Sequence, residues 1–197
     1  MKELRKVLLV VALSMSFVPQ LKSQDHQKTI YSGGMLMLQP GLTITNNKHQ
    51  DIAAMSKSIG GILRLYFFDY LTVGIYGGSQ KTNYTTTGSD NSYINLGYGG
   101  PFVGFSRESG RFRYTASAFI GMGSIKNLHI DMQNADVLTD AHHYQYSTLL
   151  LSPILSVDYA LTRKLCITMQ AVCLSGSYGD GQRLLNPTLQ VGLLFRR

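Results

Sequence analysis

The sequence predicts an all-β protein, specifically an eight-stranded antiparallel up-and-down transmembrane β-barrel. Three observations support this fold class. Apolar and polar side chains alternate with period two almost throughout the chain after residue 28. The connections between the expected strands alternate between short and long, as they do in membrane barrels. Charged residues make up only 15% of the chain, and Lys and Glu, which a solvent-facing sheet would carry, are rare within the strands.

The first 23 residues are expected to form a cleaved signal peptide. A basic start, MKELRK, precedes an apolar run at 7–18 that is too short to span a bilayer. Leu21 and Ser23 supply a −3/−1 pair for cleavage ahead of Gln24. We therefore divide the chain into a signal peptide at 1–23 and one barrel domain at 24–197. Cleavage leaves 14 basic and 10 acidic residues, so the net charge falls from +7 to +4.

Eight strands are expected in the barrel domain, separated by turn-forming residues. They cover residues 31–45, 56–68, 71–84, 93–107, 112–126, 146–159, 165–178 and 186–195. In the fourth strand, the run GYGGP at 97–101 interrupts the alternation, which predicts a β-bulge or a kink.

The fifth and sixth strands show most clearly that one face of the sheet is apolar. Alternate residues between 112 and 122 and between 149 and 159 are almost all apolar, and the opposite faces carry mainly Thr, Ser and Gly. A strand of about ten residues with such a face is long enough to cross a bilayer when it is tilted. We therefore favour a membrane barrel over a soluble secreted β-barrel or β-sandwich.

The lengths of the connections indicate how the barrel is oriented. Those after the second, fourth and sixth strands are short, and the others are longer polar segments at 46–55, 85–92, 127–145 and 179–185. An even-stranded meander places all the short turns at one end and all the long loops at the other. This is the arrangement of outer-membrane barrels, with short periplasmic turns and longer external loops.

The last expected strand ends the chain with the alternating run LQVGLLF. Its row of Leu189, Val191, Leu193 and Phe195 is expected to face lipid, and the strand should pair with the first one and remove the open edges of the sheet. Strand parity places the C-terminus on the periplasmic side, where Phe195 can lie in an aromatic girdle.

Three charged residues, Arg64, Arg113 and Asp158, are predicted to point into the lumen. Because an unpaired charge in a narrow interior is costly, each is expected to pair or to hydrogen-bond with a glutamine. The glutamines available for this are Gln39, Gln80, Gln170 and Gln190. An eight-stranded barrel is just filled by its own side chains, so a structural polar plug is favoured over a selectivity filter.

The two cysteines, Cys166 and Cys173, lie in the seventh expected strand. Their odd spacing places them on opposite faces and about 23 Å apart along the strand. A disulfide needs Cα atoms within about 7 Å, so we predict that the two residues do not pair and are small packing residues. The sequence also lacks CxxC or Cys/His spacing of the kind that binds zinc.

The expected loop at 127–145 gathers the residue types that are used in metal binding and catalysis. It contains Asp131, Asp136, Asp140, His142 and His143, and Ser147 follows it. One interpretation is a metal site, and another is half of a hydrolase site made of His143 and Ser147. A hydrolase needs a base within hydrogen-bond reach of the nucleophile and a third orienting group, and the spacing indicates neither. We therefore expect a solvated loop and predict no catalytic, cofactor-binding or metal-ligating residues.

Four segments between residues 95 and 195 are distinctive: NLGYGGPFVGF, ASAFIGMGS, LLLSPILSVDYALTRKLCITMQAVCLSGSYG and NPTLQVGLLF. They resemble the small porin-like outer-membrane β-barrel proteins of Bacteroidetes. The resemblance implies the barrel fold. It implies no activity, because the motifs are structural and many members of the family have no assigned function.

Together these features predict a non-enzymatic integral β-barrel in the outer membrane of a Gram-negative bacterium, with a role in envelope structure or loop display. The expected partners are outer-membrane lipid, the barrel-assembly machinery during insertion, and an external protein contacted through the long loops. Scattered charges and export argue against nucleic acid. Three alternatives stay open: a narrow channel for ions or small solutes, an outer-membrane enzyme acting on lipid, and a secreted lipocalin-like binder whose apolar faces point inward.

Overall fold

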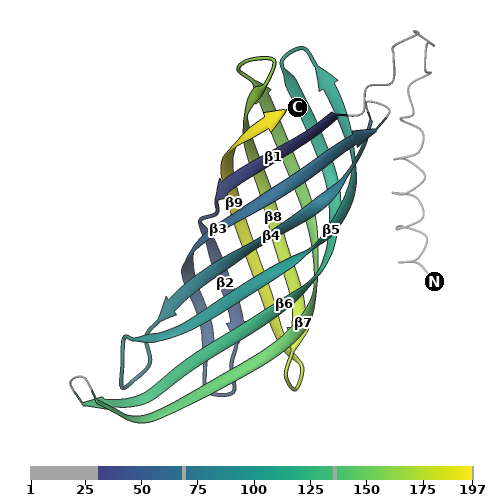
Figure 1. Cartoon of the computed structure of the whole chain (residues 1–197). Helices are drawn as coiled ribbons and strands as arrows, with labels where there is room; N and C mark the ends of the chain where they lie inside the picture. Colours follow the sequence, from purple (N-terminus) through teal and green to yellow (C-terminus); the bar gives the residue numbers. More distant parts are fainter. Residues whose placement is uncertain (1–30, 68–69, 135–136, 197) are drawn as a thin grey trace, which may run out of the picture.

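The chain forms a closed ring of antiparallel strands (Figure 1). The computed structural model describes residues 31–67, 70–134 and 137–196, so the predicted signal peptide lies outside the described residues. The described strands are β1 (Tyr31–Leu38), β2 (Gly41–Asn46), β3 (Asp51–Phe67), β4 (Leu71–Tyr84), β5 (Ser92–Ser109), β6 (Phe112–Asn134), β7 (Val137–Ala160), β8 (Leu165–Tyr178) and β9 (Gln182–Arg196). Strand β9 pairs with both β1 and β2, and β4 pairs with β3, which closes the ring. The predicted eight-stranded up-and-down barrel is confirmed.

The first predicted strand is present as two pieces, β1 and β2. Both pieces pair with β3 on one side and with β9 on the other, so they occupy a single position in the ring. The break falls at Gln39 and Pro40, and proline has no N–H to donate to the ladder. The backbone N–H of Gln39 still donates to the carbonyl of Ser58, and the carbonyl of Pro40 accepts from Leu189. The Gln39 side chain is thereby fixed on the inner face, where it is fully buried.

The ring has two different ends. The end that carries the β3–β4, β5–β6 and β7–β8 connections is called the turn end, and the other, which carries the β6–β7 connection, is called the hairpin end. At the hairpin end β6 and β7 extend beyond the neighbouring strands (Figure 1). Their pairing continues to Asn134 and Val137, so the predicted solvated loop at 127–145 is wrong. Polar residues can continue a strand pair there because the backbone ladder, rather than an apolar face, holds it together.

Two other expected connections are also shorter than predicted. The β2–β3 connection comprises only 47–50, and the β8–β9 connection only 179–181. Gly179 and Gly181 have φ angles of 54° and 97°, which other residues rarely adopt, so a tight turn is possible there. The sequence predicted long loops at one end of the barrel and short turns at the other. In the structure the difference between the two ends lies largely in how far the strands extend, not in the length of the loops.

The expected β-bulge at GYGGP is absent. Strand β5 is continuous, and Gly99 and Phe102 pair with Met122 and Phe119 in one unshifted register. Pairing with β6 lapses only at Gly100 and Pro101. Pro101 cannot donate a ladder hydrogen bond, and it lies exposed on the outer face, so the alternation of faces survives the interruption.

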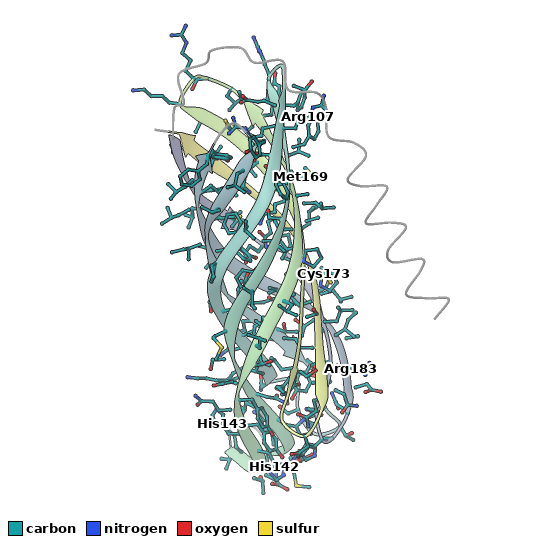
Figure 2. All side chains as sticks on the ribbon, turned by 90° about the vertical axis from the view of Figure 1, so that its right-hand side faces the viewer. Arg107, His142, His143, Met169, Cys173 and Arg183 are labelled. Carbon is teal, nitrogen blue, oxygen red and sulfur yellow. The ribbon has the colours of Figure 1, made fainter. Side chains whose placement is uncertain are left out.

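The outer face of the barrel is apolar and exposed, and the inner face is buried and mixes polar with apolar side chains. Along β7, Leu155 is 61% exposed, whereas its neighbours Ile154 and Ser156 are buried. Figure 2 shows outer-face side chains such as Met169 and Cys173 projecting away from the barrel. A secreted lipocalin-like binder would instead need a polar outer face in contact with water.

The apolar outer face is bounded at both ends. Toward the hairpin end, Lys57, Lys81 and Lys126 lie in one exposed row, linked through the register of β3, β4, β5 and β6. Toward the turn end, the ring of Phe112 packs against Tyr114 and Tyr159. On β6 the outward row between these limits is roughly 40 Å long, or roughly 30 Å in height at the tilt of membrane barrels. That height matches the hydrocarbon core of a bilayer.

The row predicted for the closing strand lies on this outer face. Leu189, Val191, Leu193 and Phe195 are all exposed, and Phe195 pairs with Gly34 of β1 and Leu165 of β8. Cys166 is buried and Cys173 is on the opposite face, so these two residues form no disulfide. Among the described residues there is no helix long and apolar enough to cross a membrane.

Candidate functional site

A chain of polar side chains crosses the lumen, and the charged residues predicted from the sequence are at its start. Arg64 on β3 donates from Nη1 to both carboxylate oxygens of Asp158 on β7, at 3.2 and 3.1 Å. Its Nη2 donates to Gln170 Oε1 on β8 at 2.6 Å. Thr168 adds a 2.8 Å hydrogen bond to Asp158. All four residues are buried, so the ion pair is shielded from solvent.

From Gln170 the chain continues around the barrel in one donor direction. Gln170 donates to Gln190 at 2.9 Å, and Gln190 donates to the hydroxyl of Tyr76. The hydroxyls of Tyr76 and Tyr98 are 2.8 Å apart, and Tyr98 donates to Gln39 Oε1 at 2.8 Å. The side chains joined in this series are called the lumen ring: Asp158, Arg64, Gln170, Gln190, Tyr76, Tyr98 and Gln39. Phe119 of β6 packs edge-on against Tyr76, so every position in the barrel contributes a side chain at this level.

Arg113, the third predicted lumen charge, lies apart from the lumen ring. It faces inward from β6 near the turn end, with its guanidinium carbon 4.4 Å from the ring centre of Tyr66. Its Nη2 is 2.7 Å from Glu108 Oε1 on β5. Glu108 is half exposed and was not among the predicted partners. It lies near Arg113 because the two residues are register partners in the pairing of β5 with β6.

The second polar site lies at the hairpin end, where β6 and β7 carry cross-strand histidines. His129 and His142 are direct register partners. Just beyond them the register shifts between Ile130 and Met132, so Asp131 is an extra residue in a bulge, a feature that redirects side chains. One carboxylate oxygen of Asp131 is 3.2 Å from His129 Nε2, and the other is 3.2 Å from His142 Nε2. A single carboxylate therefore joins the two imidazoles.

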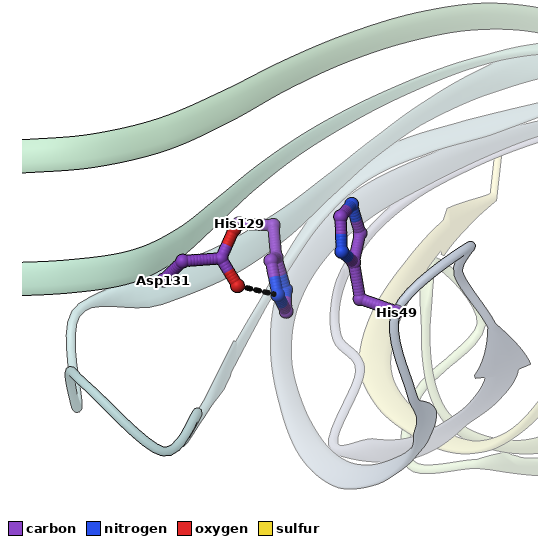
Figure 3. A group of neighbouring side chains, drawn as sticks. All are labelled: His49, His129 and Asp131. Carbon is purple, nitrogen blue, oxygen red and sulfur yellow. Dashed lines mark hydrogen bonds and ion pairs between the residues drawn. The ribbon is translucent and has the colours of Figure 1, made fainter.

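A third histidine reaches this position from the β2–β3 connection. Asn47 Oδ1 accepts from the backbone N–H of His49 at 3.0 Å and of Gln50 at 2.6 Å, which shapes the turn. The His49 ring stacks on His129 with a centroid distance of 4.3 Å and on His142 with one of 5.1 Å. Figure 3 shows His49 facing His129, with Asp131 on the far side of His129. Residues His49, His129, Asp131, Asp140 and His142 are called the mouth cluster.

His129 is the best supported member of the mouth cluster. It is buried, and its Nδ1 is 3.2 Å from the hydroxyl of Tyr84 and 3.3 Å from Asn47 Nδ2. In a neutral ring the hydrogen is on Nε2, which donates to the Asp131 carboxylate, and Nδ1 accepts from Asn47 Nδ2. Burial and then the neighbouring His49 lower the pKa of His129, which favours the neutral ring. Burial raises the pKa of Tyr84 to about 12, so this phenol stays protonated.

The mouth cluster contains two overlapping sets of metal-ligating atoms. One set comes from His49, His129 and Asp131, the other from Asp131, Asp140 and His142, and the atoms of each set lie within 4.8 Å of one another. Three of these residues were singled out in the sequence but assigned to a solvated loop. His49 and His129 were missed, because no local spacing relates a turn residue to a distant strand.

The other polar residues singled out near this site do not join it. His143 and Ser147 both lie exposed on the outer face of β7, four residues and therefore about 13 Å apart. No nucleophile–base hydrogen bond is formed over such a distance. Asp136 falls outside the described residues. Figure 2 shows His142 and His143 near one another at the hairpin end. They are successive residues of β7, so their side chains point to opposite faces of the strand.

No family model and no curated protein matches the chain. Among solved structures, Neisserial surface protein A (NspA) is similar, with 9% identity over 86% of this chain and 99% of that chain and a TM-score of 0.56. Ail, the attachment invasion locus protein of Yersinia pestis, is similar with 12% identity over 85% of this chain and 99% of that chain, at a TM-score of 0.50. At such identities the likeness shows the fold alone, which is that of the small outer-membrane β-barrel proteins.

Proposed function

We propose that this protein resides in the outer membrane of a Gram-negative bacterium, has a closed lumen, and holds the β6–β7 hairpin outside the cell for contact with a partner protein. The observation that carries the proposal is the continuous apolar outer face of the barrel. Water on the outer face would leave a continuous apolar surface exposed, whereas lipid covers it. The resemblance to Bacteroidetes barrels and the use of barrel-assembly machinery stay predictions.

The lumen ring supports a closed barrel over a narrow channel. Its side chains come from strands on all sides, and the enclosed Arg64–Asp158 pair lies in the same layer. Solute passage would require these bonds to break and the buried ions to be resolvated. We therefore propose that the protein does not conduct. Planar-bilayer recordings should give no stepwise current, and a steady ohmic conductance from heat-modifiable, folded protein would overturn the closed-lumen proposal.

The proposed role is non-enzymatic. The hydrolase interpretation relied on His143 and Ser147, which are on the lipid- and solvent-facing side of β7 and out of mutual reach. Replacing either by alanine should leave envelope lipid composition unchanged. A change in lipid acylation in either variant would favour the enzyme instead.

Membrane location and orientation can be tested in whole cells by cysteine labelling. In a background with Cys166→Ser and Cys173→Ser, Leu138→Cys places a thiol on the exposed part of β7, and Arg163→Cys places one in the β7–β8 turn. A membrane-impermeant maleimide should label the first and not the second. Equal labelling of both, or recovery of the protein in the soluble periplasmic fraction, would refute the proposed placement.

A further inference from the structure

We propose that the mouth cluster binds one divalent transition-metal ion of the Zn²⁺ type, with His49, His129 and Asp131 as its protein ligands. This inference goes beyond the display role and does not depend on it. The three residues come from the β2–β3 connection and from β6, and their ligand atoms already lie within 4.8 Å of one another. Tetrahedral coordination at bond lengths of about 2.0–2.2 Å requires this spacing to close and the exposed His49 ring to turn out of its stack on His129, so that the lone pairs of both rings point at the ion.

The donor types select the class of metal. Imidazole nitrogens suit Zn²⁺, Cu²⁺ and Ni²⁺, whereas Mg²⁺ and Ca²⁺ take sets made of oxygen ligands. Two imidazoles and one carboxylate leave a fourth position for water or an external ligand. The site is at the open end of the barrel, and His49 and Asp131 are accessible to solvent, so an ion can enter without disturbing the lumen ring.

Residues behind the proposed metal position hold the ring of His129 in place. His129 uses Nδ1 toward Tyr84 and Asn47, which leaves Nε2 directed at Asp131. Metal-ligating histidines commonly hold their other ring nitrogen in this way, because the contact sets the tautomer and the ring orientation. When a metal takes Nε2, the hydrogen shifts to Nδ1, which then donates to Tyr84 instead of accepting from Asn47, because Tyr84 gives its own hydrogen to Asn127.

His49 is the ligand that can adjust. It lies exposed in a four-residue connection, and its Nε2 is 2.9 Å from the hydroxyl of Tyr144 on β7. That contact leaves Nδ1 for the metal and gives His49 an orienting partner of its own. Asn47 links the two histidines, since it accepts from the backbone of His49 and contacts the ring of His129.

Asp131 is shared with the neighbouring residues Asp140 and His142. Its second oxygen faces His142 Nε2, and Asp140 is 3.8 Å from the same nitrogen. In the proposed complex one oxygen of Asp131 moves from His129 to the ion, while the other keeps its contact with His142. The bulge that redirects Asp131 is therefore the backbone feature on which the site depends.

The test is isothermal titration of the tag-free mature protein in detergent micelles with Zn²⁺, and separately with Mg²⁺ and Ca²⁺. We expect one Zn²⁺ per chain and no heat of binding from the other two ions. His49→Ala and Asp131→Asn should each weaken Zn²⁺ affinity by roughly tenfold or more. Both changes are at accessible positions, and heat-modifiable mobility will show that the variants are folded.

His143→Ala is the matched control, because it removes an exposed histidine adjacent to His142 on the opposite face of β7. It should leave Zn²⁺ affinity unchanged. Absence of Zn²⁺ binding to the wild-type chain would overturn the proposal, as would equal losses in His143→Ala and His49→Ala. A visible absorption band of tetrahedral Co²⁺ that survives in Asp131→Asn would also contradict the ligand set. Because the measurement is made in micelles, none of these outcomes bears on membrane location or display.

Discussion

The lumen ring and the mouth cluster are both made of polar side chains from distant strands, yet they are organised differently. In the lumen ring the hydrogen bonds run in series from Arg64 through to Gln39, and the side chains are shielded from solvent. In the mouth cluster one carboxylate is shared between two imidazoles, and His49 is exposed. A polar network that is bonded internally and shielded from solvent stabilises the fold, whereas one that faces solvent with several lone pairs can bind an ion. The comparison separates polar residues that hold the barrel closed from those that can bind.

The largest expected effect comes from breaking the enclosed ion pair. Asp158→Ala removes the acceptor for Arg64 and Thr168 and leaves a buried guanidinium without its counter-charge. We expect the free energy of unfolding to fall by about 3–5 kcal/mol. Urea titration in phosphatidylcholine vesicles, followed by circular dichroism, measures this.

The matched variant combines Arg64→Met with Asp158→Leu, which removes both charges and keeps apolar volume in the lumen. Its loss of stability should be smaller than that of Asp158→Ala alone, because no isolated charge remains. Zn²⁺ affinity should be unaffected in both variants. A double variant as unstable as the single one would mean that the pair itself, rather than the stranded charge, accounts for the effect.

A smaller effect is expected on the outer face, midway between the basic and aromatic limits of the apolar surface. Ile120 is 50% exposed there and pairs with Leu151. In lipid, Ile120→Lys should cost about 2–4 kcal/mol, and Gln145→Lys, beside the row of Lys126, should cost much less. Equal costs for the two variants would contradict immersion of this surface in a bilayer.

The sequence predicted the fold more completely than the mouth cluster, and the physical reason is the range over which each is specified. Alternation along a strand is local, so the lipid-facing row ending at Phe195 is visible in nine residues. Arg64 and Asp158 were assigned to the lumen by the same parity. The extensions of β6 and β7 through residues 127–145 were not predicted. These residues lie beyond the apolar surface, so they show no alternation of apolar and polar side chains that would indicate a strand.

The mouth cluster depends on register and on a bulge, which alternation does not encode. His129 and His142 become partners through the pairing of β6 with β7, and the insertion of Asp131 redirects its carboxylate. His49 arrives from a different hairpin. A sequence pattern records none of these relations, so residues that were visible individually could not be recognised as one site.

The smallest expected effects come from two matched phenol removals, one in each region. Tyr98→Phe removes the donor to Gln39 in the lumen ring, and Tyr84→Phe removes the partner of His129 Nδ1 at the mouth. Each should lower the free energy of unfolding by about 1–2 kcal/mol, because a buried polar partner loses a hydrogen bond. Only Tyr84→Phe should weaken Zn²⁺ binding, by about tenfold, since it alone orients a proposed ligand. If both variants, or neither, changed Zn²⁺ affinity at matched losses of stability, the division between a structural lumen and a metal-binding mouth would fail, because the two networks would then act as one.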